Sequence, residues 1–171
     1  MKTLLHLLAI FFSSLAVAQT ESGIYETYST RSIEEDIQLE YNVGEDRVML
    51  KGYSPVSYLE ENKAEEGSAD FQLKIGPVVY QFVNQDQLLK FQEDPDRYIP
   101  LYGGYCAYGV AMGKHLDIDP TNFKIIGGKT YLFLKNQEVD AKKLWDAKSE
   151  KKQLADAAAY WQILRLLPDE G

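Results

Sequence analysis

Residues 71–82 read Phe71-Gln72-Leu73-Lys74-Ile75-Gly76-Pro77-Val78-Val79-Tyr80-Gln81-Phe82, and this stretch decides the fold class. Its first five residues alternate apolar and polar side chains, which is the two-residue period of a strand with one buried face. Gly76-Pro77 is a turn, and a run of strand-forming residues follows it. The stretch therefore predicts an antiparallel β-hairpin.

A second hairpin is predicted in the C-terminal half of the chain. Residues 123–126 and 130–134 are rich in strand-forming side chains, and Gly127-Gly128 lies between them. Two shorter apolar stretches, 48–50 and 114–118, are also expected to be strands. No repeat of long period is evident in the sequence.

Helices are predicted around these hairpins. Ser54-Pro55 and Asn84 are residue types that begin helices, and residues 33–39 fit one further short helix. From residue 138 the pattern is helical, with Leu154 and Trp161 on the side that is expected to dock on the sheet. The predicted class is α+β: small antiparallel hairpins packed against short helices, with a C-terminal amphipathic helix.

The composition excludes several classes of function. The chain has 171 residues, 45% of them hydrophobic, and a formal net charge of −8, which fits one folded acidic domain. Because no basic run is present, nucleic acid and anionic membrane are poor candidates as partners. One cysteine and two histidines allow neither an intrachain disulfide nor a multi-cysteine zinc or iron–sulfur site.

Residues 1–18 have the parts of a signal peptide: a positively charged start, a short apolar run and the cleavage motif Ala16-Val17-Ala18. The alternative is an uncleaved N-terminal anchor. We expect an exported protein, located in the periplasm, without a membrane span after signal removal. Residues 19–46 are then a polar acidic lead-in, and residues 47–167 are the folded domain with its C-terminal helices.

The most unusual stretch begins Tyr102-Gly103-Gly104-Tyr105-Cys106-Ala107-Tyr108-Gly109. If a helix begins after the glycines, Cys106 lies in its first turn, where unpaired N–H groups and the helix dipole lower a thiol pKa. Cys106 is then a redox thiol or a metal ligand. The third possibility is a buried structural cysteine.

Three further residues are candidate metal ligands. His115, Asp117 and Asp119 alternate along the chain, so they share one side of the expected strand. With Cys106 they offer a sulfur, an imidazole and two carboxylates, a mixed set that suits zinc or copper. The alternative is a surface histidine on a polar strand face.

The tyrosines of the unusual stretch are candidate pocket residues. Tyr102, Tyr105 and Tyr108 recur every three residues, and Gly103 and Gly104 allow close approach of a ligand. Phenol hydroxyls could line a pocket there. The alternative is aromatic packing with the hydroxyls at the rim.

Several motifs, in this order along the chain, resemble the YHS domain, and in particular its exported bacterial branch. The matching segments are Leu50-Lys51-Gly52-Tyr53-Ser54-Pro55-Val56-Ser57-Tyr58, Tyr80-Gln81-Phe82, Phe91-Gln92-Glu93-Asp94-Pro95-Asp96-Arg97-Tyr98 and Tyr102-Gly103-Gly104-Tyr105-Cys106-Ala107-Tyr108-Gly109. The resemblance covers about residues 41–165. It implies a small α+β module that is encoded near heavy-metal transporters and binds metal through cysteines.

The family's cysteine positions carry no cysteine in this chain. The first falls within Val56-Ser57-Tyr58, and the other two fall at Val83 and at Gln87 or a neighbour. The metal function of those positions therefore does not transfer, and Cys106 is the one thiol that remains.

We therefore expect an exported YHS-domain protein that binds or handles a metal, as an accessory to metal-transport or redox proteins. One alternative is a thiol-based redox protein that uses Cys106. Another is a non-catalytic structural or partner-binding module. Signal removal leaves His115 as the one histidine, so a conventional acid–base enzyme is not favoured.

Overall fold

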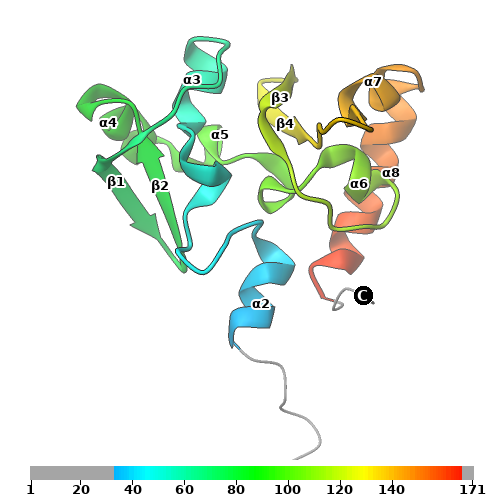
Figure 1. The fold of residues 1–171 in the computed structure, drawn as a ribbon, viewed down its shortest axis with the longest axis horizontal. Coiled ribbons are helices and arrows are strands. Elements are labelled where there is room, and N and C mark those ends of the chain that lie inside the picture. Colours follow the sequence, from blue (N-terminus) through cyan, green and yellow to red (C-terminus); the bar gives the residue numbers. More distant parts are fainter. Residues whose placement is uncertain (1–32, 167–171) are drawn as a thin grey trace, which may run out of the picture. The chain divides into compact units, whose positions relative to one another are not determined.

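The structure is a computed structural model that describes residues 33–166, and it has two antiparallel hairpins surrounded by helices (Figure 1). The predicted α+β class is confirmed. The predicted signal peptide and the first part of the lead-in lie outside the described residues. In chain order the elements are α2 (Ile33–Glu40), η1 (Met49–Gly52), α3 (Pro55–Glu60), β1 (Ser68–Ile75), β2 (Val78–Phe82), α4 (Gln85–Glu93), α5 (Pro95–Tyr98), η2 (Leu101–Gly104), α6 (Ala107–Ala111), β3 (Asp119–Ile126), β4 (Lys129–Phe133), α7 (Ala141–Asp146) and α8 (Glu150–Leu164).

Both predicted hairpins are confirmed. β1 pairs with β2 so that Ile75 lies opposite Val78, and β3 pairs with β4 so that Ile126 lies opposite Lys129. β2 alternates buried and half-buried residues, as a strand does when one face packs on a core. In each hairpin the first strand is longer than the second, and the register shifts near the start of the first strand.

The described chain contains a structural repeat that the sequence does not reveal. An η turn, a short helix, a hairpin and a capped helix follow one another twice, first in residues 49–93 and then in residues 101–146. We call these the N-terminal and C-terminal repeats. Both hairpins combine an eight-residue strand with a five-residue strand, and Figure 1 shows them in separate halves of the described fold.

The η turns carry the most specific sign of this repeat. Leu50, Lys51 and Gly52 have φ values of 58°, 55° and 87°. The corresponding residues of η2 are Tyr102, Gly103 and Gly104, with φ values of 57°, 57° and 82°. Three successive left-handed residues are rare, so their recurrence before a short helix marks the two turns as equivalent.

The helices after the hairpins are also equivalent. The side chain of Asn84 accepts a hydrogen bond from the backbone N–H of Gln87 and caps α4. Asp140 accepts from the backbone N–H of Lys143 and caps α7 in the same way. The C-terminal repeat continues into α8, a helix of 15 residues, whereas the N-terminal repeat continues into the four-residue α5.

One buried core connects the two repeats. The rings of Tyr58 and Phe123 lie 4.9 Å apart between centroids, and the buried Tyr58 hydroxyl donates to the carbonyl oxygen of Pro120 at 3.0 Å. The fully buried tryptophan is Trp145 on α7, while Trp161 on α8 is half-buried. Trp161 packs on the edge of this core and is not at its centre.

Two short strands that the sequence predicted are not strands. Residues 48–50 lead into η1, because the left-handed Leu50 and Lys51 turn the chain sharply. Residues 114–118 have no ladder partner, and the carbonyl of Leu116 accepts one hydrogen bond from the N–H of Cys106. The packed region also extends back into the expected lead-in, since Leu39 is buried and Asn42 N–H donates to Gly103.

The C-terminal helix is rotated relative to the prediction. Its most buried residues are Gln153, Ala157 and Leu164, while Leu154 and Trp161, which were expected on the docking side, are only half-buried. None of the helices in residues 33–166 has the length and apolar character needed to cross a membrane.

Candidate functional site

The glycine-rich stretch forms a tight turn against the end of α2. Gly103 has a φ of +57°, and a Cβ at this position would lie 1.7 Å from the carbonyl oxygen of Glu40. Asn42 fixes the same turn, since its backbone N–H donates to the Gly103 carbonyl and its side chain donates to the Gly104 carbonyl. The glycines are therefore needed because two backbone segments approach each other closely here. The expected role in ligand access does not explain them.

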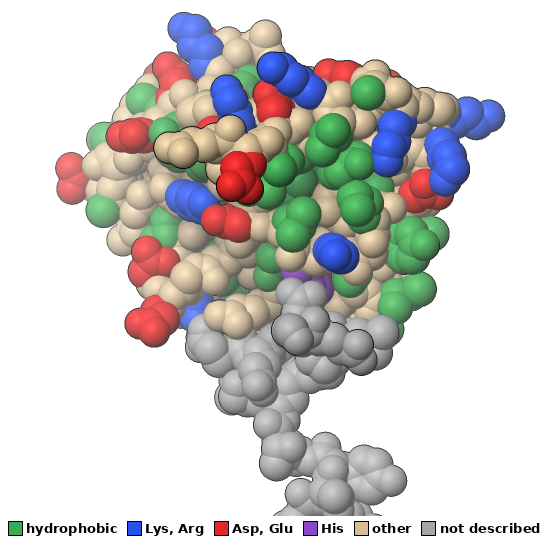
Figure 2. All heavy atoms as spheres, turned by 45° about the vertical axis from the view of Figure 1, so that its right-hand side comes forward, with side chains coloured by type: hydrophobic (Ala, Val, Ile, Leu, Met, Phe, Trp, Pro, Cys, Tyr) green, Lys and Arg blue, Asp and Glu red, His purple; other side chains and the backbone are tan. Residues whose placement is uncertain are grey.

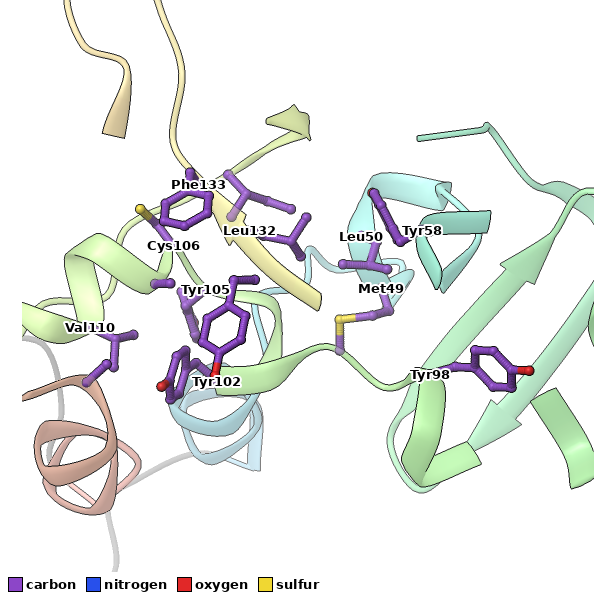
Figure 3. Close-up of a cluster of buried hydrophobic side chains, with 14 of the residues drawn as sticks. Met49, Leu50, Tyr58, Tyr98, Tyr102, Tyr105, Cys106, Val110, Leu132 and Phe133 are labelled. Atoms are coloured by element: carbon purple, nitrogen blue, oxygen red, sulfur yellow. The ribbon is translucent and has the colours of Figure 1, made fainter. Parts of the chain in front are cut away.

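Cys106 follows this turn as the N-cap of α6. The residue is completely buried, its N–H donates to Leu116, and it lies in the core with Leu132 and Phe133 (Figure 3). Burial raises the pKa of the Cys106 thiol above its ordinary value, although nearby backbone hydrogen bonds oppose the shift. The expected lowering of the pKa is not found, because α6 has five residues and desolvation outweighs its N-terminus.

The four expected metal ligands belong to separate networks. The ring of His115 lies 4.4 Å from that of Tyr105 and 6.2 Å from that of Trp161, between centroids. Asp119 accepts hydrogen bonds from the backbone N–H and the hydroxyl of Thr121. Within residues 33–166, no group of three or more His, Cys, Asp or Glu side chains is arranged to hold a metal ion.

Asp117 is held by a cation of the protein itself. Its carboxylate lies 2.7 Å from Lys51 Nζ and also accepts from the side chain of Asn42 and the N–H of Ile118. Burial alone would raise the pKa of Asp117, but the hydrogen bonds from these three donors lower it below its ordinary value. This carboxylate therefore ties η1 to the approach of β3.

The candidate pocket tyrosines pack against other rings. Tyr102 is buried edge-on between Tyr131 and Trp161, with both centroids 5.9 Å away. Burial raises the pKa of Tyr102. The Tyr105 hydroxyl donates to the carbonyl oxygen of Gln38. Aromatic packing, the alternative interpretation of this stripe, describes both residues.

Tyr108 lies further out than the other two. It is half-buried, and Lys148 Nζ lies 4.9 Å from its ring centroid and donates to its hydroxyl at 3.0 Å. This contact connects α6 to the turn before α8. It places a lysine beside an aromatic ring at the surface.

The structure also brings together the positions at which the YHS resemblance places cysteines. Gln87 Nε2 donates to Ser57 Oγ at 3.0 Å, and Gln87 Oε1 accepts from the backbone N–H of Val83 at 3.3 Å. Ser54 Oγ also donates to Gln87 Oε1, at 2.7 Å, and both serines are fully buried. A neutral hydrogen-bond network therefore occupies these positions, and none of its residues carries a thiol.

One surface feature, a set of exposed hydrophobic side chains, was not predicted from the sequence. Among the described residues, the exposed large hydrophobic side chains are Leu89, Met112, Leu144, Tyr160, Ile163 and Leu166. All except Leu89 belong to the C-terminal repeat, to α8 or, in the case of Leu166, to the residues directly after α8. The i, i+3 spacing of Tyr160 and Ile163 could have indicated this surface, but only the side of the helix with Leu154 and Trp161 entered the prediction.

Neither protein-family models, nor curated proteins, nor solved structures gave a match to this chain.

Proposed function

We propose that the protein is an exported, non-catalytic binding module, built on a duplicated YHS-like unit, and that it contacts its partner through one apolar surface. We call this surface the C-terminal apolar face and define it by Met112, Leu144, Tyr160 and Ile163. The observation that carries the proposal is the exposure of these four large side chains on helices that contact one another, on the side where Figure 2 shows hydrophobic side chains gathered. Monomeric proteins rarely expose a contiguous apolar patch without an interaction that uses it.

The members of the face come from packed elements. A Cβ on Gly113 would lie 3.5 Å from the ring of Tyr160, so the end of α6 is next to the exposed side of α8. Tyr160 and Ile163 are neighbours on the α8 surface, and Leu144 lies on α7, which contacts both other helices. Figure 2 shows hydrophobic side chains gathered on the side of the protein that carries these helices.

The chemistry expected from the sequence has less support from the geometry. Cys106 is buried with a raised pKa, and His115, Asp117 and Asp119 each belong to a different network. A thiol that cannot reach solvent is a poor nucleophile and a poor ligand for an incoming metal. Binding through a surface does not require any of these groups.

Site-specific photocrosslinking in the exporting cell tests the proposal. A photoreactive phenylalanine analogue in place of Ile163 is expected to give one reproducible adduct. The same analogue in place of Leu89, which is equally exposed on α4, is the matched control and is expected to give none. Identical adduct patterns at both positions, or neither a protein nor a lipid adduct at position 163, would contradict the proposal.

A further inference from the structure

The charges around the C-terminal apolar face differ in sign from those of the rest of the protein. Residues 33–138 contain ten Lys and Arg against eighteen Asp and Glu, whereas residues 139–166 contain six against four. Residues 139–166 are therefore a locally basic segment, although Asp169 and Glu170 in the last five residues balance its charge in the sequence. The basic side chains of this region are Lys142, Lys143, Lys148, Lys151, Lys152 and Arg165.

The carboxylates of this region are already paired. Asp146 and Glu150 lie 2.8 Å and 2.6 Å from Lys124 Nζ, and Asp156 lies 2.5 Å from Lys152 Nζ. Their negative charge is thus offset within the protein, so the region presents its remaining lysines and arginine to the outside.

Four exposed cations near the face form no ion pair within residues 33–166: Lys114, Lys148, Lys151 and Arg165. Lys114 follows α6, Lys148 precedes α8, and the other two lie on α8 or directly after it. Figure 2 shows basic side chains, with acidic ones between some of them, around the hydrophobic ones on this side of the protein. The face is therefore apolar at its centre and positive at its edge.

We propose that the partner of the C-terminal apolar face is an anionic lipid surface, against which α8 lies in the plane of the head groups. This inference rests on the proposed function and names its partner, and it departs from the expectation, drawn from the absence of a basic run, that an anionic membrane is a poor candidate. The exposed large apolar side chains of α8 are Tyr160 and Ile163, and Lys151 and Arg165 lie at its two ends; apolar side chains bordered by cations are typical of interfacial helices. The lysine stems lie along the apolar boundary while their ammonium groups reach the lipid phosphates.

The chemistry of the edge favours lipid over a folded protein. Its cations are exposed and, apart from Lys148 on Tyr108, no side-chain contact within residues 33–166 fixes them, so they match negative charge spread over a fluid surface. A negatively charged protein partner would instead be recognised through hydrogen-bonding groups held in fixed positions. The acidic remainder of the chain adds orientation, because an anionic surface repels it and attracts this end.

Vesicle sedimentation with the full exported chain tests the inference. The chain is expected to bind vesicles of phosphatidylglycerol and phosphatidylcholine in equal parts, and to bind vesicles of phosphatidylcholine alone far less. High salt should weaken the binding, because surface charges are screened. Equal binding to both vesicle types, or none to either, would overturn the inference.

Two pairs of variants locate the contact. Ile163→Ser should lower the vesicle partition constant about tenfold, since a half-exposed isoleucine is lost from the lipid contact. Its control is Leu89→Ser on α4, which should leave binding unchanged. Lys148→Glu with Lys151→Glu should lower it by more than about tenfold. Lys63→Glu with Lys74→Glu makes the same charge change on the N-terminal repeat and is expected to have little effect.

The combined results separate this inference from the proposed function. If the face variants bind like their controls, lipid is not the partner. A reproducible protein adduct at position 163 without vesicle binding overturns the inference and leaves the proposed function standing. A dimer that Ile163→Ser dissolves, again without vesicle binding, overturns it in favour of a second copy of this chain. If the analogue at position 163 gives no specific adduct and the chain binds no vesicles, both proposals are contradicted.

Discussion

At the scale of a single residue, Cys106 shows burial outweighing the effect of a helix end. The sequence places the thiol beside a helix N-terminus, but the residue is completely buried and its pKa is raised. We expect the native thiol to alkylate far more slowly at neutral pH than the thiol of the unfolded chain. The measurement is the alkylation rate against denaturant concentration. Rapid reaction in native conditions would restore the redox interpretation.

Copper or zinc binding remains a prediction from the sequence, and the same residue tests it. The dispersal of Cys106, His115, Asp117 and Asp119 leads us to expect that Cys106→Ala leaves the metal content of the purified chain unchanged. Metal analysis of the chain and the variant, both purified without chelators, is the measurement. A stoichiometric metal that disappears in the variant would establish Cys106 as a ligand.

Asp117 gives a prediction about pH. Its folded-state pKa is below the ordinary value, so its contribution to stability is fully present above the ordinary pKa and is lost as the pH falls through the folded-state pKa. The carboxylate is exposed, so Asp117→Asn should cost less than about 1 kcal/mol at neutral pH. This cost should disappear in acid. Asp70→Asn, at an exposed site on β1, is the control, and an equal effect there would contradict the assignment.

At the scale of the elements, the sequence predicts what local patterns determine. Residue alternation and glycine turns specify both hairpins, and Asn84 specifies the start of α4. The η turns were missed because Leu50, Lys51 and Tyr102 adopt left-handed conformations that their side chains do not favour. Long-range packing holds these three residues in the left-handed conformation, so no local sequence pattern predicts the η turns.

Gly103 tests the packing of η2 on the end of α2. An alanine Cβ would overlap the Glu40 carbonyl oxygen, so Gly103→Ala should cost more than about 3 kcal/mol in the free energy of unfolding. Gly127→Ala is the matched control, because its φ of +58° is the same and nothing lies near its Cβ position. That variant should cost about 1 kcal/mol, the strain alone. Equal losses in denaturant unfolding would show that the contact with Glu40 is unimportant.

Gln87 tests the buried network at the positions where the YHS resemblance places cysteines. Gln87→Leu leaves the hydroxyls of Ser54 and Ser57 without their acceptor or donor, and should cost about 2–3 kcal/mol. Gln85→Leu changes an exposed residue of the same helix and should be close to neutral. A cost below about 1 kcal/mol for Gln87→Leu would mean that water or a rearrangement satisfies both serines.

At the scale of the whole molecule, the sequence conceals both the repeat and the candidate surface. Equivalent positions of the two repeats share few residues, such as Gly52 with Gly104 and Tyr80 with Tyr131, so the duplication becomes evident through backbone conformation and register. The C-terminal apolar face draws on three helices, and the net charge averages away its basic edge. Both features depend on which distant segments become neighbours, and composition carries no information about that.

The shared core predicts that the two repeats unfold together. Tyr58 of the N-terminal repeat contacts Phe123 and Pro120 of the C-terminal repeat, so neither repeat buries its apolar surface alone. Both tryptophans, Trp145 and Trp161, lie after the N-terminal repeat and report on the C-terminal half. Tryptophan fluorescence and far-ultraviolet circular dichroism should therefore give the same denaturation midpoint.

Tyr58→Phe makes that test specific. It removes the buried hydroxyl that donates to Pro120 and keeps the ring on Phe123, so it should lower the free energy of unfolding by about 1 kcal/mol. Because unfolding is cooperative, the tryptophan midpoint should shift as far as the dichroism midpoint, although the substitution lies in the other repeat. Tyr53→Phe is the control, since the Tyr53 hydroxyl bonds to an exposed Glu66 within its own repeat. If Tyr58→Phe left the tryptophan fluorescence midpoint unchanged and broadened the circular dichroism transition, the two repeats would be shown to fold independently.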